Sequence, residues 1–281
     1  MKTYLECLPC FLNQALRAGK VASDKEEVVH KIMNNTAASI PGLDMNLSPA
    51  ENGMPVYKDV FKQTGVEDPY REIKRKHIAD ALAILPELES IVEQSSDPLL
   101  TAIRIAIAGN VIDLGIPDKF NLLEDVKKIL KQDFGIFDYE QFKEKLKESS
   151  SILYLGDNAG ESVFDRLLIK VLKKPVIYAV REHPIINDVT HEEAILSGLD
   201  KVAKIVSSGT TAPGTLLHLC NDEFIEEFRN AGLIISKGQG NYEGLSDEKG
   251  VPVFFLLKAK CAPIANDLGV KQGDIVLKSL S

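Results

Sequence analysis

The chain of 281 residues has no tryptophan, only four cysteines, no block of lysine or arginine, and no long apolar run. Four cysteines are too few for a disulfide scaffold of this length, so reduced thiols are expected. A net charge of −8 without a basic block makes a nucleic-acid partner unexpected. No apolar run approaches the roughly 18 residues of a membrane span, and the N-terminus is too polar for a signal peptide. We therefore expect a cytoplasmic protein with no membrane partner.

Three widespread enzyme signatures are also missing. The sequence contains neither the G-x-G-x-x-G of dinucleotide sites nor the G-x-x-x-x-G-K-[ST] of P-loop proteins. It also lacks the G-x-S-x-G of many serine hydrolases. Nicotinamide cofactors, P-loop nucleotide hydrolysis and a serine nucleophile are therefore disfavoured.

Residues 1–145 have the pattern of a helical region. EEVVHKIMNNTAASI and ALAILPELESIVEQS repeat apolar residues at three- and four-residue spacing, as amphipathic helices do. DPLLTAIRIAIAGNVIDLG is apolar almost all round, which is typical of a buried helix. Proline and glycine interrupt residues 41–56, which we predict to be a loop. Because no segment alternates like a strand, we expect an all-helical N-terminal region.

Residues 146–281 change from a helical to a strand pattern. Short runs rich in Val, Ile and Leu alternate here with helical segments: SILYLG (151–156), PVIYAV (175–180), KVAKIVSS (201–208), LIISKG (233–238), VPVFFLLKAK (251–260) and DIVLKS (274–279). Alternation of this kind predicts an α/β fold, with a mostly parallel sheet and flanking helices. We therefore predict a helical region over 1–145 and an α/β domain over 146–281.

Polar residues follow the predicted strands at the points where the strands end. Asp157, Asn158 and Glu161 follow the first run, and Arg181 and Asp188 follow the second. Lys237 and Asn241 come at the end of the fourth run and after it, and Lys258 and Lys260 end the fifth. The third run is followed by the small-residue loop SSGTT. Parallel strands present their carboxyl ends at one edge of a sheet, where ligands bind. We expect these groups to converge there and to form an active site.

Oxygen donors dominate the start of this set. Asp157, Asn158 and Asp188 are hard ligands that suit Mg²⁺, Mn²⁺ or a similar divalent ion. A single Asp-Asn pair after a strand is more often a turn or a helix cap, so only the combination indicates a metal site. The cations Arg181, Lys237 and Lys258 or Lys260 suit a phosphate or carboxylate. A metal facing cations and glycine-rich loops predicts phosphoryl chemistry.

Two further motifs have several interpretations. CLPC places Cys7 and Cys10 at a spacing used by structural thiols, by metal sites and by redox pairs, and a zinc site would need a further ligand. AGNVIDLG places Asn110 and Asp113 among apolar residues, where each needs a polar partner. Either they form internal hydrogen bonds or they line the pocket.

The order of these motifs resembles a known family. GDNAGE, REHPIINDVT, ISKGQGNYEGL and LLKAKCAPIANDLGV follow AGNVIDLG and the N-terminal CLPC over nearly the whole chain. In this the sequence is similar to the damage-control phosphatase family, first catalogued as domain-of-unknown-function family eighty-nine. It resembles the prokaryotic branch that carries an N-terminal C-x-x-C.

The resemblance implies a metal-dependent phosphatase with a Rossmann-like sheet, acting on small phosphorylated metabolites such as sugar phosphates or damaged metabolites. It implies that Asp157, Asn158 and Asp188 bind the metal and that Lys237 contacts phosphate. Asn110, Arg181, Glu161 and Asn241 stand in matching motifs, and all but Glu161 are expected to bind substrate.

The mechanism expected from these residues uses one divalent ion, whether Mn²⁺, Co²⁺, Ni²⁺ or Mg²⁺, to activate a water. Lys237 would neutralise charge on the phosphoryl oxygens, and Glu161 would orient or deprotonate the water. A rival mechanism has a carboxylate such as Asp157 attack directly, giving an aspartyl-phosphate. Two alternative functions stay open, an adenosyl-cofactor-dependent methyltransferase and a non-catalytic metabolite-binding module.

Overall fold

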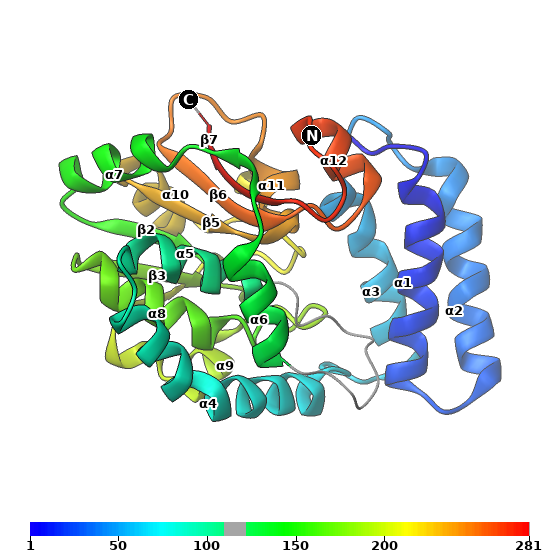
Figure 1. Cartoon of the computed structure of the whole chain (residues 1–281). Coiled ribbons are helices and arrows are strands. Elements are labelled where there is room, and N and C mark those ends of the chain that lie inside the picture. Colours follow the sequence, from blue (N-terminus) through cyan, green and yellow to red (C-terminus); the bar gives the residue numbers. More distant parts are fainter. Residues whose placement is uncertain (110–121, 281) are drawn as a thin grey trace.

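The apolar runs of the second half assemble into one sheet at the centre of the protein (Figure 1). The computed structural model describes residues 1–109 and 122–280. The strands are β1 (Phe134–Phe137), β2 (Ile152–Leu155), β3 (Val176–Val180), β4 (Lys204–Ser207), β5 (Ile234–Lys237), β6 (Val253–Lys258) and β7 (Ile275–Ser279). Their order is β1-β7-β6-β5-β2-β3-β4, and β6–β7 is antiparallel while the other pairs are parallel. The predicted α/β fold with a mostly parallel sheet is confirmed.

Helices cover both faces of the sheet. The helices that share the first apolar cluster with the sheet are α4 (Arg71–Glu93), α5 (Pro98–Gly109), α6 (Leu122–Lys131), α7 (Tyr139–Glu148), α8 (Ser162–Leu172) and α9 (His191–Leu196). The opposite cluster includes α10 (Asp222–Asn230), α11 (Gly238–Leu245) and α12 (Ala262–Leu268). None of the helices in the described ranges combines the length and the apolar character needed to cross a bilayer.

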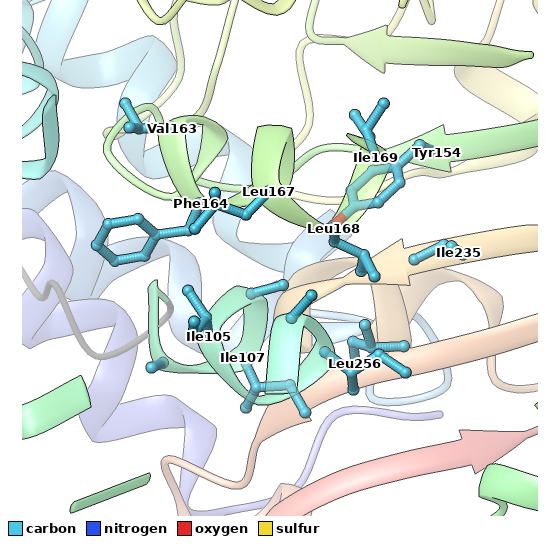
Figure 2. Close-up of a cluster of buried hydrophobic side chains, with 14 of the residues drawn as sticks. Ile105, Ile107, Tyr154, Val163, Phe164, Leu167, Leu168, Ile169, Ile235 and Leu256 are labelled. Carbon is cyan, nitrogen blue, oxygen red and sulfur yellow. The ribbon is translucent and has the colours of Figure 1, made fainter. Parts of the chain in front are cut away.

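The two clusters follow the period of the strands. In β2, Tyr154 belongs to one cluster, while Leu153 and Leu155 belong to the other, because successive side chains of a strand point to opposite faces. Figure 2 shows the first cluster, where Ile107 of α5 and Leu168 of α8 lie beside the sheet. Burial of this kind contributes about 25 cal/mol for each Å² of apolar surface removed from water.

The helical N-terminal half divides into two parts. α1 (Cys7–Ala22), α2 (Glu26–Ser39) and α3 (Pro49–Thr64) form a bundle with its own apolar cluster, to one side of the sheet (Figure 1). α4 to α6 instead pack on the sheet with α8. Short 3₁₀ turns complete the described elements: Ile40–Gly42, Leu199–Lys201 and Leu217–Leu219.

Two local predictions were wrong. The region expected to be all-helical contains β1, which pairs with β7 from the far end of the chain. Its sequence, FGIF, is too short to show alternation, and a distant strand supplies its hydrogen bonds. The loop predicted over 41–56 ends early, because Ser48 accepts a hydrogen bond from the Glu51 amide and Pro49 starts α3.

The strand order contains a switch point between β2 and β5. From β2 the chain adds β3 and β4 on one side, and it then returns to place β5 on the other side of β2. Ligands in open α/β sheets bind at such a point, beyond the carboxyl ends of the strands. The loop that begins at Gly156 and the helix α11 that begins at Gly238 leave the sheet here.

A buried cation ties α4 to α9. Lys74 has no solvent-exposed surface, and its Nζ lies 2.8 Å from both Asp68 Oδ2 and Glu193 Oε1. Glu193 also accepts from the Thr190 amide in a capping box at the start of α9. Burial raises the pKa of Glu193, but Lys74 and Thr190 outweigh that effect and hold the pKa below its ordinary value. The ion pair therefore fixes α9 directly after the loop that carries Asp188.

We predict that Lys74→Met lowers the free energy of unfolding by about 3–5 kcal/mol, because two buried carboxylates lose their counter-charge. Lys170→Met is the matched control: Lys170 pairs with Glu89 at 2.7 Å, but about half of its side chain (47%) is exposed. That variant should lose no more than about 1 kcal/mol. Urea unfolding measures both, and equal losses would refute the importance of the buried pair.

Candidate active site

Two loops at the switch point are hydrogen-bonded to each other. The loop after β2 and the loop after β3 form an antiparallel bridge between Asn158 and Asp188. The Val189 amide donates to the Asp157 carbonyl and the Ala159 amide donates to the Asn187 carbonyl, both at 2.8 Å. The three residues predicted to bind a metal are thereby brought together, although they come from different loops.

The orientation of the Asn158 side chain is fixed by Glu161. The Asn158 amide nitrogen Nδ2 donates to Glu161 Oε1 at 2.7 Å. An asparagine that uses its NH₂ group in this way presents its carbonyl oxygen Oδ1 elsewhere. Asn158 is therefore oriented as an oxygen donor, which is the role that a hard cation requires.

The orientation of the Asp188 side chain is fixed by Arg181. Its Nε donates to Asp188 Oδ2 at 2.8 Å, and its Nη2 donates to Asn241 Oδ1 at 2.9 Å. Asn241 in turn donates to the backbone carbonyls of Gly156 and Lys237. Arg181 and Asn241, both predicted to bind substrate, are thus buried at the site and joined to its framework.

The surroundings of the two aspartates raise the pKa of both carboxyl groups. Burial raises the pKa of Asp157 well above its ordinary value, and the charges of Glu161 and Asp188 raise it further. Burial also raises the pKa of Asp188, although Arg181 opposes this effect. A bound cation would relieve both costs, because it stabilises the ionised carboxylates.

The loop after β5 comes unusually close to Asp157. Gly238 has a φ of +76°, and a Cβ added there would lie 1.8 Å from Asp157 Oδ2. Any side chain at this position would displace the carboxylate. Gly238, the first residue of α11, consequently lies beside Asp157, and a helix N-terminus favours an anion such as phosphate.

The donor set fits a divalent ion. Within the described ranges, no group of three or more His, Cys, Asp and Glu is arranged to hold a metal. The candidate ligands are instead two carboxylates and one amide oxygen, from Asp157, Asp188 and Asn158, and they are nearly buried. Such an all-oxygen set suits hard ions and leaves room for water and substrate.

Lys237 lies beneath this site in a fully buried network. Its Nζ donates to Glu161 Oε2 at 3.0 Å and to Asp165 Oδ1 at 2.7 Å. Asp165 also accepts from the hydroxyls of Tyr154 and Tyr178, at 2.6 and 2.7 Å. Burial lowers the pKa of Lys237, but Asp165 and Glu161 outweigh it and raise the pKa above its ordinary value. Lys237 is a charged residue held inside the protein by two carboxylates.

Asp165, Tyr154 and Tyr178 belong to this network but were not predicted from the sequence. The spacing of Glu161 and Asp165 does indicate that the two acids lie together, because they are four residues apart at the start of a predicted helix and so share one face. The partner of these two acids could not be found in that way, since Lys237 lies on β5.

Lys260 is a second cation near the candidate ligands. It follows β6, and its positive charge lowers the pKa of Asp157 against the larger effect of burial. Unlike Lys237, which is completely buried, Lys260 is partly exposed to solvent. Lys258 or Lys260 was predicted from the sequence to suit a phosphate or carboxylate.

The remaining predicted residues have separate outcomes. Cys7 is buried, which raises its pKa to about 11, whereas Cys10 is exposed and its Sγ accepts from Gln14 Nε2 at 3.3 Å. A high pKa makes Cys7 a poor nucleophile at neutral pH. A metal or redox role for this pair stays a prediction.

Asn110 and Asp113 lie outside the described residues, so the role predicted for Asn110 also stays a prediction.

Comparison with known proteins gives a consistent result. The family model of the damage-control phosphatase ARMT1-like domain matches residues 3–276. Damage-control phosphatase PH1575 of Pyrococcus horikoshii is 36% identical over 284 residues, covering 98% of this chain and 97% of the relative. A damage-control phosphatase of Archaeoglobus fulgidus is 36% identical over 290 residues, covering 99% of each chain.

A solved structure agrees with these sequence matches. The crystal structure of a DUF89 family protein, PH1575 from Pyrococcus horikoshii, superposes with a TM-score of 0.89 at 34% identity and covers 100% of both chains. The family resemblance drawn from the sequence motifs is confirmed. The chain belongs to the damage-control phosphatase ARMT1-like domain family.

Proposed function

We propose that the protein is a metal-dependent phosphatase that hydrolyses phosphomonoesters of small metabolites. The observation that carries this proposal is the pair of buried aspartates with raised pKa, joined by an oriented asparagine oxygen at the switch point of the sheet. The relatives named damage-control phosphatases support hydrolysis over methyl transfer or simple binding.

Asp157, Asn158 and Asp188 would hold one divalent ion, with Mn²⁺, Co²⁺, Ni²⁺ and Mg²⁺ as the candidates. When bound, such an ion would polarise a phosphoryl oxygen and activate a water. The protein's own contribution is to prepare the ligands: Glu161 turns the Asn158 oxygen outward, and Arg181 holds Asp188.

We assign the phosphate contacts to Lys260 and to the first amides of α11. Lys260 has solvent access and acts on the charge of Asp157, and Gly238, the first residue of α11, adjoins the same carboxylate. Donors that neutralise developing charge on phosphoryl oxygens stabilise the transition state. Lys237 is instead a positioning residue, because two carboxylates already occupy it inside the protein.

We assign Glu161 the positioning of Asn158 and not proton transfer. One of its oxygens accepts from Asn158 and the other from Lys237, so both face partners within the protein. Water is then the nucleophile that we propose. Acid quenching with labelled substrate separates this route from an aspartyl-phosphate on Asp157, because only the second leaves label on the protein.

The direct test is phosphate release from a set of sugar phosphates and other phosphomonoesters, measured after chelation and with each of the four ions. We expect activity only with added ion, and we expect Asp157→Asn and Asp188→Asn to lower kcat/KM by roughly a hundredfold or more. Asp222→Asn, an exposed acid in the first turn of α10, is the control and should change nothing. Ion-independent activity, or full activity in Asp188→Asn, would contradict the proposal.

Substitutions of Lys237 and Lys260 should affect stability and substrate binding differently. Lys237→Met leaves Glu161 and Asp165 buried without a counter-charge, so we expect a loss of about 3–5 kcal/mol in the free energy of unfolding. Lys260→Met should change that free energy by less than about 1 kcal/mol while raising KM for the phosphomonoester. Urea unfolding and steady-state kinetics give both readouts. A stable Lys237→Met protein with a selective loss of phosphate binding would restore the role predicted from sequence.

Ion binding should depend on pH with a definite sign. Because the pKa values of Asp157 and Asp188 are raised, protons compete with the ion at a higher pH than at ordinary aspartates. The rise in Tm caused by saturating Mn²⁺ should therefore shrink as the pH falls from about 8 to about 5. Differential scanning fluorimetry measures this rise. A rise that is constant over this range would place the ion elsewhere.

A further inference from the structure

A cavity of about 360 Å³ lies between the N-terminal bundle and the loop after β3. Its walls come from α1, α3, residues 66–70, the loop 183–186 and Thr211. Small-molecule sites commonly measure roughly 300–1,000 Å³, so the cavity is large enough for a compact organic group. The candidate ion site itself is built from other residues, and the cavity is therefore an additional feature.

One tight turn connects the cavity to the ion site. The Asp188 amide donates to the Ile185 carbonyl at 3.0 Å, which closes a turn over residues 185–188. Ile185 and Ile186 line the cavity, whereas Asp188 contributes to the ion site. A ligand whose phosphate binds the ion held beside Asp188 would reach the two isoleucines with its organic part.

The turn is strained at Ile186, which has a φ of +46°. A β-branched residue rarely adopts this conformation, and the cost is about 1–3 kcal/mol. Glycine would relieve the strain at this position but would remove an apolar side chain from the cavity wall. Ile186 packs against the cluster of the N-terminal bundle, which holds the turn in place.

The wall supplied by α3 includes Tyr57. Burial raises the pKa of Tyr57 well above its ordinary value, and the neighbouring Tyr70 and the Asp188 carboxylate raise it further. The Tyr57 hydroxyl donates to Gln14 Oε1 at 2.9 Å. Its hydrogen bond is made within the protein, which leaves the apolar ring as the part that faces a ligand.

The lining of the cavity is mainly apolar. Most of its residues are aliphatic or aromatic, including Val60, Phe61, Val66, Tyr70, Ile185 and Ile186. Phe61 and Val66 keep 49% and 37% of their surface exposed, so both are available to an apolar ligand. The charged or titratable residues of the lining are Lys58, Glu67, His183 and Asp68, and Asp68 is already paired with Lys74.

We propose that this cavity is the subsite for the organic part of the substrate, and that it selects phosphomonoesters whose organic group is aromatic or otherwise apolar. The proposal rests on the proposed phosphatase function and specifies its substrate class. A phosphate bound to the ion that Asp157, Asn158 and Asp188 would hold lies next to the turn at 185–188, because Asp188 ends that turn. The organic group then enters between Ile186 and the aromatic residues of α3.

The first test measures binding without turnover. Calorimetry with methylphosphonate and naphthylmethylphosphonate, in the presence of Mn²⁺, compares a small with a bulky apolar group on the same stable anion. We expect the naphthylmethyl compound to bind at least about tenfold more tightly, because it removes apolar surface from water. Equal affinities would overturn the proposal, and this readout does not depend on catalytic activity.

A matched pair of variants locates the effect. Phe61→Ser should remove most of the preference for the naphthylmethyl compound. Phe137→Ser changes a phenylalanine of similar exposure, 47%, on β1 and outside the cavity, and it should keep the preference. A preference that survives Phe61→Ser, or is lost equally in both variants, would contradict the subsite.

Kinetics then distinguish this proposal from the phosphatase proposal. We expect kcat/KM for naphthylmethyl phosphate to exceed that for glycerol phosphate by roughly tenfold, and since both are alkyl esters the leaving group does not account for the difference. Equal values for the two esters would refute the subsite and leave the phosphatase proposal standing. Failure to release phosphate from either ester with any of the four ions, together with the expected binding preference, would refute the phosphatase proposal and leave the subsite standing.

Discussion

The site depends on the buried bond between Lys237 and the carboxylates of Glu161 and Asp165. It joins β5 to α8 across the switch point of the sheet, and it leaves the second oxygen of Glu161 to bind Asn158. A buried charge of this kind persists only when its partners are well placed, because the cost of removing it from water is large. The network therefore fixes the direction of the Asn158 oxygen through Glu161, and Arg181 fixes Asp188 by a hydrogen bond of its own.

Much of this arrangement was predictable from the sequence, and the reason is topological. Parallel strands bring their carboxyl ends to one edge, so Asp157, Asn158 and Asp188 could be grouped without knowledge of any contact. Side-chain roles could not be assigned in the same way. Lys237 ends a strand at the right edge, but its position after Ile234 to Ser236 does not say whether it faces a ligand or the interior. The contact of Lys237 with Asp165 of α8 decides that Lys237 faces the interior. Likewise, β1 could not be predicted from its own residues, because its partner strand β7 is the last strand of the chain.

In the proposed subsite, the N-terminal bundle would supply a second element of specificity. Its α3 helix supplies an apolar wall close to a turn whose far end carries Asp188. The sheet edge provides the groups proposed to bind the phosphate, whereas the bundle would set which organic group fits beside them. The strain at Ile186 is consistent with this division, since strained backbone persists where surrounding structure holds it for a function.

Anomalous diffraction from crystals grown with Mn²⁺ tests whether a divalent ion binds between Asp157, Asn158 and Asp188. We predict one strong anomalous peak within coordination distance of the two carboxylates and of the Asn158 oxygen, with the Asn158 nitrogen still bonded to Glu161. A peak at another group of residues, or no peak under conditions that support phosphate release, would contradict it.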